Sequence, residues 1–248
     1  MPVSAEDFAR AKRRTVIKWL AAALLIILVG VWTFKRSTSS QDSVKTLNDG
    51  EQLLKKGRYA EAIQSFDRAL EGQSGLVNAY LLRGRANAAL NQSEAAIQDF
   101  TSAARLDPGS ADALMERAAV RLQVKDYPAV VADCGEAIRR NPKLSRAYTL
   151  RAMALREMGN LPQSLEDLDR AVELSPDIDT YFQRATTYQL LGKHSQARAD
   201  LDQVIVLLPS SPLGYLARAK SREAMGDSAG ARSDRETSRK LERREPGH

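Results

Sequence analysis

The chain has 248 residues, of which 43% are hydrophobic and 6% aromatic, so it can form a sizeable core built from helix-forming residues. Its formal net charge of +6 does not indicate a nucleic-acid-binding face, because residues 1–36 carry seven cations against two carboxylates and so hold +5 of it. The single cysteine, Cys134, excludes an internal disulfide. We interpret it as a small buried hydrophobe on a helix, with a reactive thiol or an intermolecular disulfide as the alternatives.

The N-terminal segment is predicted to anchor the chain in a membrane. Residues 1–14 form a basic N-terminus, and residues 15–34 have the length and apolar character of a transmembrane helix. Trp19 and Trp32 lie near its ends, where interfacial aromatic residues are expected. A cleaved signal peptide and a buried core helix are the alternatives, but the run ends VWTFKRSTSS without a good cleavage site. Residues 35–42 are predicted to form a short polar tether.

The charges around this span predict its orientation. Five cations precede or open it and two follow it, so the positive-inside rule places the N-terminus in the cytoplasm. The rest of the chain would then lie across the membrane, in the periplasm of a bacterium with two membranes. We therefore expect a single-pass protein of a bacterial inner membrane.

From residue 43 onward, one unit of about 34 residues recurs six times, which is typical of a repeat protein. Its copies are residues 43–76, 77–110, 111–144, 145–177, 178–211 and 212–241, followed by a charged tail at 242–248. Within a copy, apolar residues recur at helical spacing on both sides of a turn, as Tyr148, Ala152 and Leu155 do before Gly159. The eighth position is always small: Gly50, Gly84, Ala118, Ala152, Ala185 and Ala219. Each copy therefore predicts a pair of closely packed antiparallel helices that needs its neighbours for stability.

This pattern resembles the tetratricopeptide repeat (TPR), and the segment GRYAEAIQSFDRAL at Gly57–Leu70 is similar to the family's turn and second helix. The resemblance implies an all-α fold, a right-handed α-solenoid of about six helix hairpins, here preceded by one transmembrane helix. It also implies a concave groove that commonly binds peptides or protein segments. The first and last copies depart from the pattern at Thr46, Ser74, Arg235 and Ser238, as terminal repeats with a polar outer face do.

Arginine recurs at the seventh position and aspartate sixteen residues later, a series that we call the ladder. The pairs are Arg83 and Asp99, Arg117 and Asp133, Arg151 and Asp167, Arg184 and Asp200, and Arg218 and Asp234. We interpret them as structural ion pairs that fix helix register. The alternative is a cationic stripe for an acidic ligand.

The groove implied by the resemblance is lined by the first helix of each copy. Its candidate partner-binding residues are Asn78, Leu81, Arg85, Asp112, Met115, Arg146, Thr149, Met153, Arg156, Phe182 and Gln189, with Ala88, Ala119, Gln123, Asp179 and Thr186 beside them. The fifth positions carry no lysine, which disfavours the family's carboxylate-gripping mode of binding a chaperone tail. We expect an extended or helical segment with apolar anchors instead.

Catalysis is not predicted, because the chain has only His194 and His248 and no glycine-rich phosphate loop. The DLD triplets at Asp167–Asp169 and Asp200–Asp202 suggest a metal site, but residues two apart on a helix point in different directions. The alternating charges of Arg232–Arg244 are interpreted as a solvated face of the last helix, with a membrane-surface or nucleic-acid contact as the alternative. We expect no cofactor, no metal, no nucleic acid and no small-molecule substrate.

The sequence therefore predicts a membrane-anchored TPR scaffold or adaptor that binds a protein or peptide in its groove and is not an enzyme. Two alternatives stay open. One is a structural subunit of a membrane assembly that self-associates, and the other is an import-type receptor of an organelle with its repeats facing the cytosol.

Overall fold

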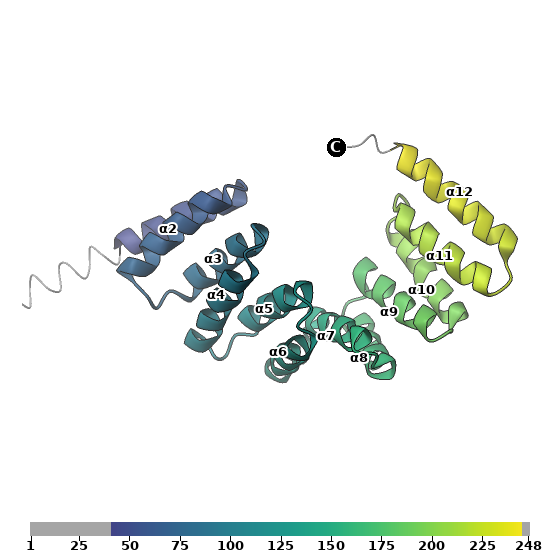
Figure 1. Ribbon diagram of the computed structural model, residues 1–248, viewed down its shortest axis with the longest axis horizontal. Coiled ribbons are helices and arrows are strands. Elements are labelled where there is room, and N and C mark those ends of the chain that lie inside the picture. Colours follow the sequence, from purple (N-terminus) through teal and green to yellow (C-terminus); the bar gives the residue numbers. More distant parts are fainter. Residues whose placement is uncertain (1–40, 245–248) are drawn as a thin grey trace, which may run out of the picture. The chain divides into compact units, whose positions relative to one another are not determined.

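A computed structural model describes residues 41–244 of the chain, and this part is all-α (Figure 1). It is helical over residues 41–55. The helices that follow are α2 (Tyr59–Gly72), α3 (Val77–Ala89), α4 (Ser93–Leu106), α5 (Asp112–Gln123), α6 (Tyr127–Arg140), α7 (Ser145–Glu157), α8 (Leu161–Leu174), α9 (Ile178–Leu190), α10 (His194–Leu207), α11 (Pro212–Ala224) and α12 (Ser228–Arg244). The chain divides into two compact units, one ending at Ala86 and one beginning at Asn87.

The transmembrane helix predicted at residues 15–34 lies outside the described residues, as do the basic N-terminus and most of the tether. Gln41 and Asp42, which the sequence places in the tether, are already helical. Among residues 41–244, no helix is both long enough and apolar enough to span a membrane.

The turn inside each hairpin has the same backbone geometry in all six copies. Its residue has a positive φ of 72° at Gly57, 82° at Gly159, 71° at Gly192 and 84° at Gly226. In the second and third copies Asn91 (58°) and Lys125 (63°) take the same left-handed conformation, which costs a lysine more than a glycine. The repeat therefore imposes this turn even where the local sequence does not favour it.

The first unit packs around Phe66 of α2, which is fully buried together with Ala62 and Ala69. Gly50, on the preceding helix, faces this ring so closely that a Cβ there would lie 2.5 Å from a ring carbon. A glycine at the eighth position of this copy therefore lets the two helices close over a full-sized aromatic side chain.

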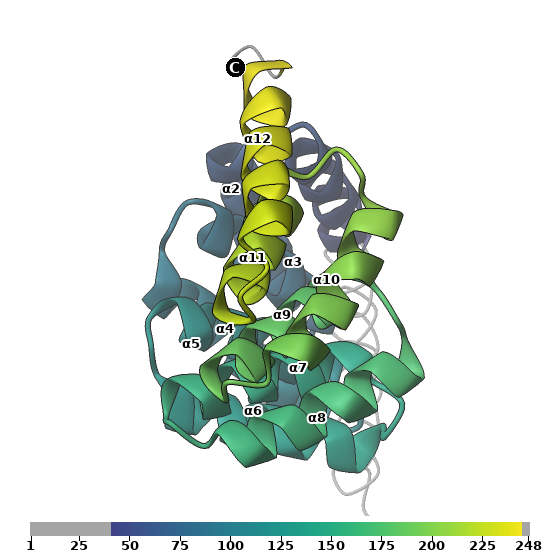
Figure 2. The ribbon, with the colours of Figure 1, turned by 90° about the vertical axis from the view of Figure 1, so that its right-hand side faces the viewer.

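In the second unit, each helix from α4 to α12 packs on the next one in sequence. Figures 1 and 2 show α11 and α12 lying along one another as one such pair. The first helices of successive copies also meet, because α7 contacts both α5 and α9. These three helices therefore share one face, which the second helices of the hairpins do not cover.

Small side chains recur in the core clusters of the second unit. One cluster joins Ala118, Val130, Cys134, Leu150 and Ala154, a second joins Leu114, Met115, Ala137 and Ala147, and a third joins Ala185, Ala197 and Leu201. Alanine at these contacts allows close approach of the helices, and the first two clusters each span the third and fourth copies. The apolar stripe of one hairpin is therefore covered by its neighbours, as expected for a solenoid.

Candidate functional site

Four ladder pairs of the second unit form two-bond ion pairs. Nε and Nη2 of each arginine donate to the two carboxylate oxygens of the aspartate sixteen residues later. The distances are 3.0 and 2.7 Å for Arg117–Asp133, 2.8 and 2.6 Å for Arg151–Asp167, 2.8 and 2.7 Å for Arg184–Asp200, and 3.0 and 2.7 Å for Arg218–Asp234. The four aspartates are at most 5% exposed. Each pair thus joins the two helices of one hairpin.

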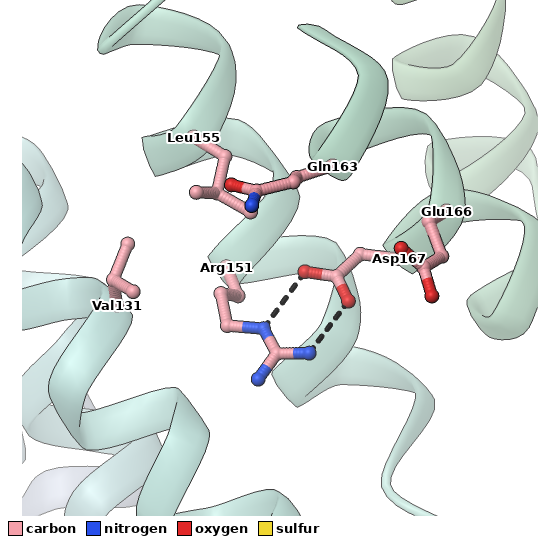
Figure 3. A pocket seen from close by; sticks show the side chains of 6 residues that line it. All are labelled: Val131, Arg151, Leu155, Gln163, Glu166 and Asp167. Carbon is pink, nitrogen blue, oxygen red and sulfur yellow. Dashed lines mark hydrogen bonds and ion pairs between the residues drawn. The ribbon is translucent and has the colours of Figure 1, made fainter. Parts of the chain in front are cut away.

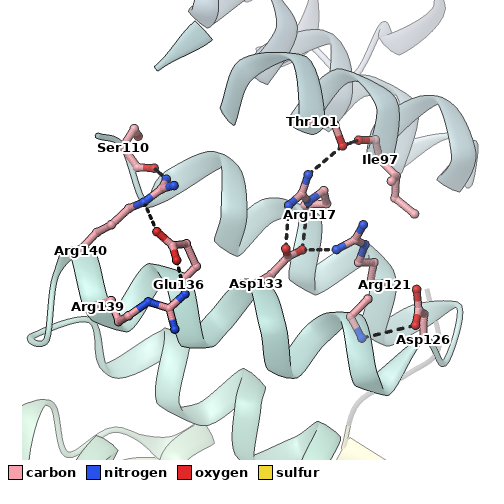
Figure 4. A network of polar contacts seen from close by, with 11 residues as sticks. Ile97, Thr101, Ser110, Arg117, Arg121, Asp126, Asp133, Glu136, Arg139 and Arg140 are labelled. Carbon is pink, nitrogen blue, oxygen red and sulfur yellow. Dashed lines mark hydrogen bonds and ion pairs between the residues drawn. The ribbon is translucent and has the colours of Figure 1, made fainter. Parts of the chain in front are cut away.

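The remaining nitrogen, Nη1, reaches back to the preceding copy. Nη1 of Arg117 donates to the Thr101 hydroxyl at 2.9 Å. In the same way, Nη1 of Arg184 donates to Asp169 at 2.9 Å, and Nη1 of Arg218 donates to Asp202 at 2.7 Å. In the first unit, Nη1 of Arg83 likewise binds Asp67. Figure 4 shows Arg117 held between Thr101 and Asp133 in this way. We call these acceptors the back partners. An arginine with a back partner therefore connects two copies as well as two helices.

The back partners explain the DLD triplets. Asp167 binds Arg151 of its own copy, while Asp169 binds Arg184 of the next. Asp200 and Asp202 divide their roles between two arginines in the same way. The sequence signal for the back partner is a polar side chain fifteen or sixteen positions before a ladder arginine, which our sequence reasoning did not identify.

Tyrosine and a second arginine complete the ladder. Each of Arg83, Arg151, Arg184 and Arg218 lies 5.5–5.9 Å from the ring centre of the tyrosine three residues before it. Asp133 also accepts from Arg121 at 2.7 Å, and Asp234 contacts Arg222 at 3.0 Å. Hydrogen bonds to their aspartates raise the pKa of Arg151, Arg184 and Arg218. The ladder thus consists of paired charges, which argues against a cationic stripe.

A pocket of about 460 Å³ opens on the face shared by α5, α7 and α9. It brings together four residues that the sequence placed in the groove: Met115, Arg146, Thr149 and Asp179. Met115 and Thr149 are buried in its floor, at 9% and 4% exposure. Arg146 is exposed and makes no hydrogen bond or ion pair within residues 41–244.

The other residues lining this pocket were not predicted. They are Lys143, Leu144, Ser145, Ser175, Asp177 and Thr180. Asp177 caps α9, because its carboxylate accepts from the backbone N–H of Thr180 at 2.8 Å and from its hydroxyl at 2.9 Å. Most of these residues belong to the loops between copies. The sequence prediction used only positions within the first helix of each copy and therefore did not include them.

Two predicted groove residues are engaged in contacts between helices. Arg156 donates to Gln183 of α9 at 2.9 Å, and burial lowers its pKa. Gln189 donates to the Ala217 carbonyl at 2.9 Å and to the Ser221 hydroxyl at 2.8 Å. Both side chains therefore hold neighbouring copies together.

The remaining predicted groove residues are distributed over both units. Phe182 is half-buried against the Ala185 cluster, and Met153 is half-buried on α7. Asp112 is exposed at the start of α5. In the first unit, Asn78 and Arg85 are exposed on α3 and Leu81 is half-buried. The pocket therefore unites the part of the predicted set that lies near the N-terminal ends of α7 and α9.

Two features predicted from the sequence concern metal and thiol chemistry. Within residues 41–244, no cluster of three or more His, Cys, Asp or Glu side chains could hold a metal ion. Cys134 is buried, and burial raises the pKa of its thiol to about 12, so it is not a reactive thiolate.

These features define the chain as an α-solenoid of helix hairpins. Three family models match it, all described as tetratricopeptide repeat, at residues 48–111, 145–178 and 179–211. The chain is a TPR protein, whose fold is generally non-enzymatic. No curated protein matches its sequence.

Several solved structures share the fold. A tetratricopeptide repeat protein from Parabacteroides merdae has a TM-score of 0.64 at 24% identity, over 80% of this chain and 78% of that chain. MamA from Desulfovibrio magneticus RS-1 has a TM-score of 0.63 at 22% identity, over 68% and 96%. YrrB, described as a TPR protein with an unusual peptide-binding site, has a TM-score of 0.56 at 19% identity, over 79% and 92%.

Proposed function

We propose that this chain is a membrane-anchored TPR adaptor that binds a segment of a protein partner on the face shared by α5, α7 and α9. The observation that carries the proposal is the 460 Å³ pocket on that face, where buried Met115 and Thr149 lie beside exposed Arg146. Met115 in the floor and exposed Arg146 at the rim suit a segment that carries an apolar anchor and an acidic residue. TPR proteins commonly bind protein or peptide partners, and YrrB is described as having a peptide-binding site.

A photo-crosslinking side chain placed at Arg146 in the full-length protein tests the groove in native membranes. We expect an adduct of discrete mass from this position and none from Gln98, an exposed residue of α4. Arg146→Glu, tested with the crosslinker at Met153, should reduce the adduct several-fold if the partner is acidic. Equal crosslinking from Arg146 and Gln98, or a yield unaffected by Arg146→Glu, would argue against this groove.

The membrane anchor and the topology are tested separately. We expect the full chain to stay with membranes after alkaline extraction, and a chain without residues 1–36 to be released. A reporter fused after His248 should be active only on the extracytoplasmic side. Release of the full chain would exclude the anchor, and a reporter active in the cytoplasm would favour the receptor with the opposite topology.

Self-association is the second candidate function, and exposed apolar side chains on two neighbouring helices favour it. Val206 is 70% exposed at the end of α10, and Leu213 (64%) and Leu216 (47%) are exposed on α11. Patches of this kind often mark interaction sites. If copies associate through it, Leu213→Glu combined with Leu216→Glu should turn an oligomer into a monomer in sedimentation of the detergent-solubilised chain. A wild-type monomer would exclude this function.

A further inference from the structure

Arg151 differs from the other ladder arginines of the second unit. Its Nε and Nη2 donate to Asp167, as described above, but its Nη1 has no hydrogen-bond partner within residues 41–244. In Arg117, Arg184 and Arg218 all three nitrogens are bonded. The junction between α6 and α7 therefore retains a donor that the equivalent junctions use internally.

The cause is a single residue. Gly135 of α6 holds the position of the back partner, sixteen residues before Arg151, so no side chain reaches Nη1. A Cβ at Gly135 would lie 3.9 Å from Nη1 of Arg151 and also 3.9 Å from Nη1 of Arg139. Two guanidinium groups thus flank the space where the other copies place Thr101, Asp169 or Asp202.

The Arg151 side chain is held in position at this space. Asp167 fixes the guanidinium plane through two hydrogen bonds, and Tyr148 lies with its ring centre 5.7 Å away. Arg151 also borders a pocket of about 280 Å³. Figure 3 shows its third nitrogen turned away from the Asp167 carboxylate. A ligand at Nη1 would therefore meet a donor that needs no rearrangement.

We propose that this hollow, bordered by Gly135, Arg139 and Arg151, binds a carboxylate from an acidic side chain of a partner protein. One carboxylate oxygen would accept from Nη1 of Arg151, as the Asp169 and Asp202 carboxylates accept from Arg184 and Arg218. Successive residues are 100° apart around a helix, so Arg151 lies on the side of α7 opposite to Arg146 and Met153. The site is thus a second contact surface and does not rest on the groove.

The surrounding charges decide how selective this site is. The exposed Glu166 lines the 280 Å³ pocket that Arg151 borders, and Arg139 is itself paired with Glu136. The hollow is therefore not strongly positive, and its recognition depends on the direction of its N–H donors. Binding of an isolated carboxylate should be weak, with a dissociation constant on the order of 10–100 mM.

Binding of acetate to the full-length chain in detergent micelles tests the proposal. The arginine Nε–Hε signals are followed by NMR at constant ionic strength, with acetamide as the uncharged probe of the same shape. We expect a saturable shift of the Arg151 signal with acetate and none with acetamide, while the signals of Arg184 and Arg218 stay in place. Absence of a saturable Arg151 shift, or an equal shift of all three signals, would overturn the proposal.

Two variants locate the effect. Gly135→Asp should abolish the acetate shift because the new carboxylate occupies the hollow. Arg139→Gln should weaken acetate binding about threefold or more and leave the Arg151–Asp167 pair intact. An acetate response unchanged in both variants would contradict the site. An acetyl-Ala-Asp-Ala-amide peptide that binds at least as tightly as acetate supports an acidic side chain as the ligand. Binding of acetyl-Ala-Ala with its free C-terminal carboxylate alone would overturn that assignment.

Discussion

The junction between α6 and α7 and the junction between α8 and α9 are built on the same plan and differ in their acceptors. At the later junction, Arg184 contacts two carboxylates, Asp200 of its own copy and Asp169 of the preceding one. At the earlier junction, Arg151 has Asp167 alone, because Gly135 takes the place of the second acceptor. A single position per repeat therefore determines whether all three nitrogens of a ladder arginine are bonded within the fold or Nη1 is left for other contacts.

The comparison also separates stability from recognition in this fold. The fully bonded arginines connect copies and use all three of their nitrogens within the fold. Arg151 contributes less to the connection between copies, and its Nη1 has no partner within residues 41–244. Four predictions test this contrast, in order of decreasing effect on the free energy of unfolding.

Removing Asp167 should destabilise the chain more than removing Asp200. Asp167→Ala leaves the partly buried Arg151 without any carboxylate, whereas Asp200→Ala leaves Arg184 with Asp169. We expect losses of about 3 kcal/mol and about 2 kcal/mol, respectively. Urea unfolding followed by circular dichroism measures both, and an equal or reversed order would contradict the contrast between the junctions.

Filling the gap should stabilise the chain. Gly135→Asp supplies the missing acceptor, and replacing a glycine within a helix is itself favourable. Gly135→Asn is the matched control because it has a similar helix propensity and no charge. We expect Gly135→Asp to exceed the control by about 0.5–1 kcal/mol at low salt, with the difference shrinking as salt is added. Equal stability of the two variants would show that the charge of the back partner does not matter.

Opening the later junction should reproduce the earlier one. Asp169→Ala removes the back partner of Arg184 but leaves its pair with Asp200. The Asp169 side chain is 48% exposed, so the loss of stability should be at most about 1 kcal/mol. The Arg184 Nε–Hε signal should then respond to acetate as that of Arg151 does. A silent Arg184 signal would mean that a free Nη1 is not sufficient for carboxylate binding.

Cys134 offers a measurement that does not perturb stability. It lies beside Gly135 and is fully buried, and burial raises the pKa of its thiol to about 12. At pH 8 the thiolate fraction should be on the order of one in ten thousand, so iodoacetamide should modify the native chain very slowly. Asp167→Ala should speed modification more than Asp200→Ala does. Rapid alkylation of the wild type would show that this core cluster opens readily.

The repeat periodicity predicted much of the fold, because one pattern recurs in register across the chain. Small residues at the eighth position of each copy indicated the close helix contacts. Two of these residues, Ala118 and Ala185, are buried in core clusters. The left-handed turns at Asn91 and Lys125 could not be predicted from those residues alone. There the packing of the neighbouring copies decides the backbone conformation.

The candidate site was less accessible to sequence reasoning. A spacing of sixteen within one copy indicated partners such as Arg184 and Asp200, which the structure shows bonded. The bond from Arg184 to Asp169 crosses between copies, and nothing in the spacing within one hairpin indicates it. The loop residues of the groove pocket, such as Lys143 and Ser175, were missed because their positions depend on how successive hairpins stack. The placement of the membrane anchor and the role of the groove remain predictions.

The back partners also determine how far a disturbance travels along the array. In a repeat protein, stability is roughly a sum of terms for single copies and for the interfaces between neighbours. Arg117, Arg184 and Arg218 each add a bond across an interface, and Arg151 does not. The interface between the third and fourth copies therefore lacks this hydrogen bond, and its contribution to the coupling between copies is smaller. Opening that begins in a terminal copy of the second unit should stop there more often than at the other interfaces, so amide hydrogen exchange should divide the unit at this point.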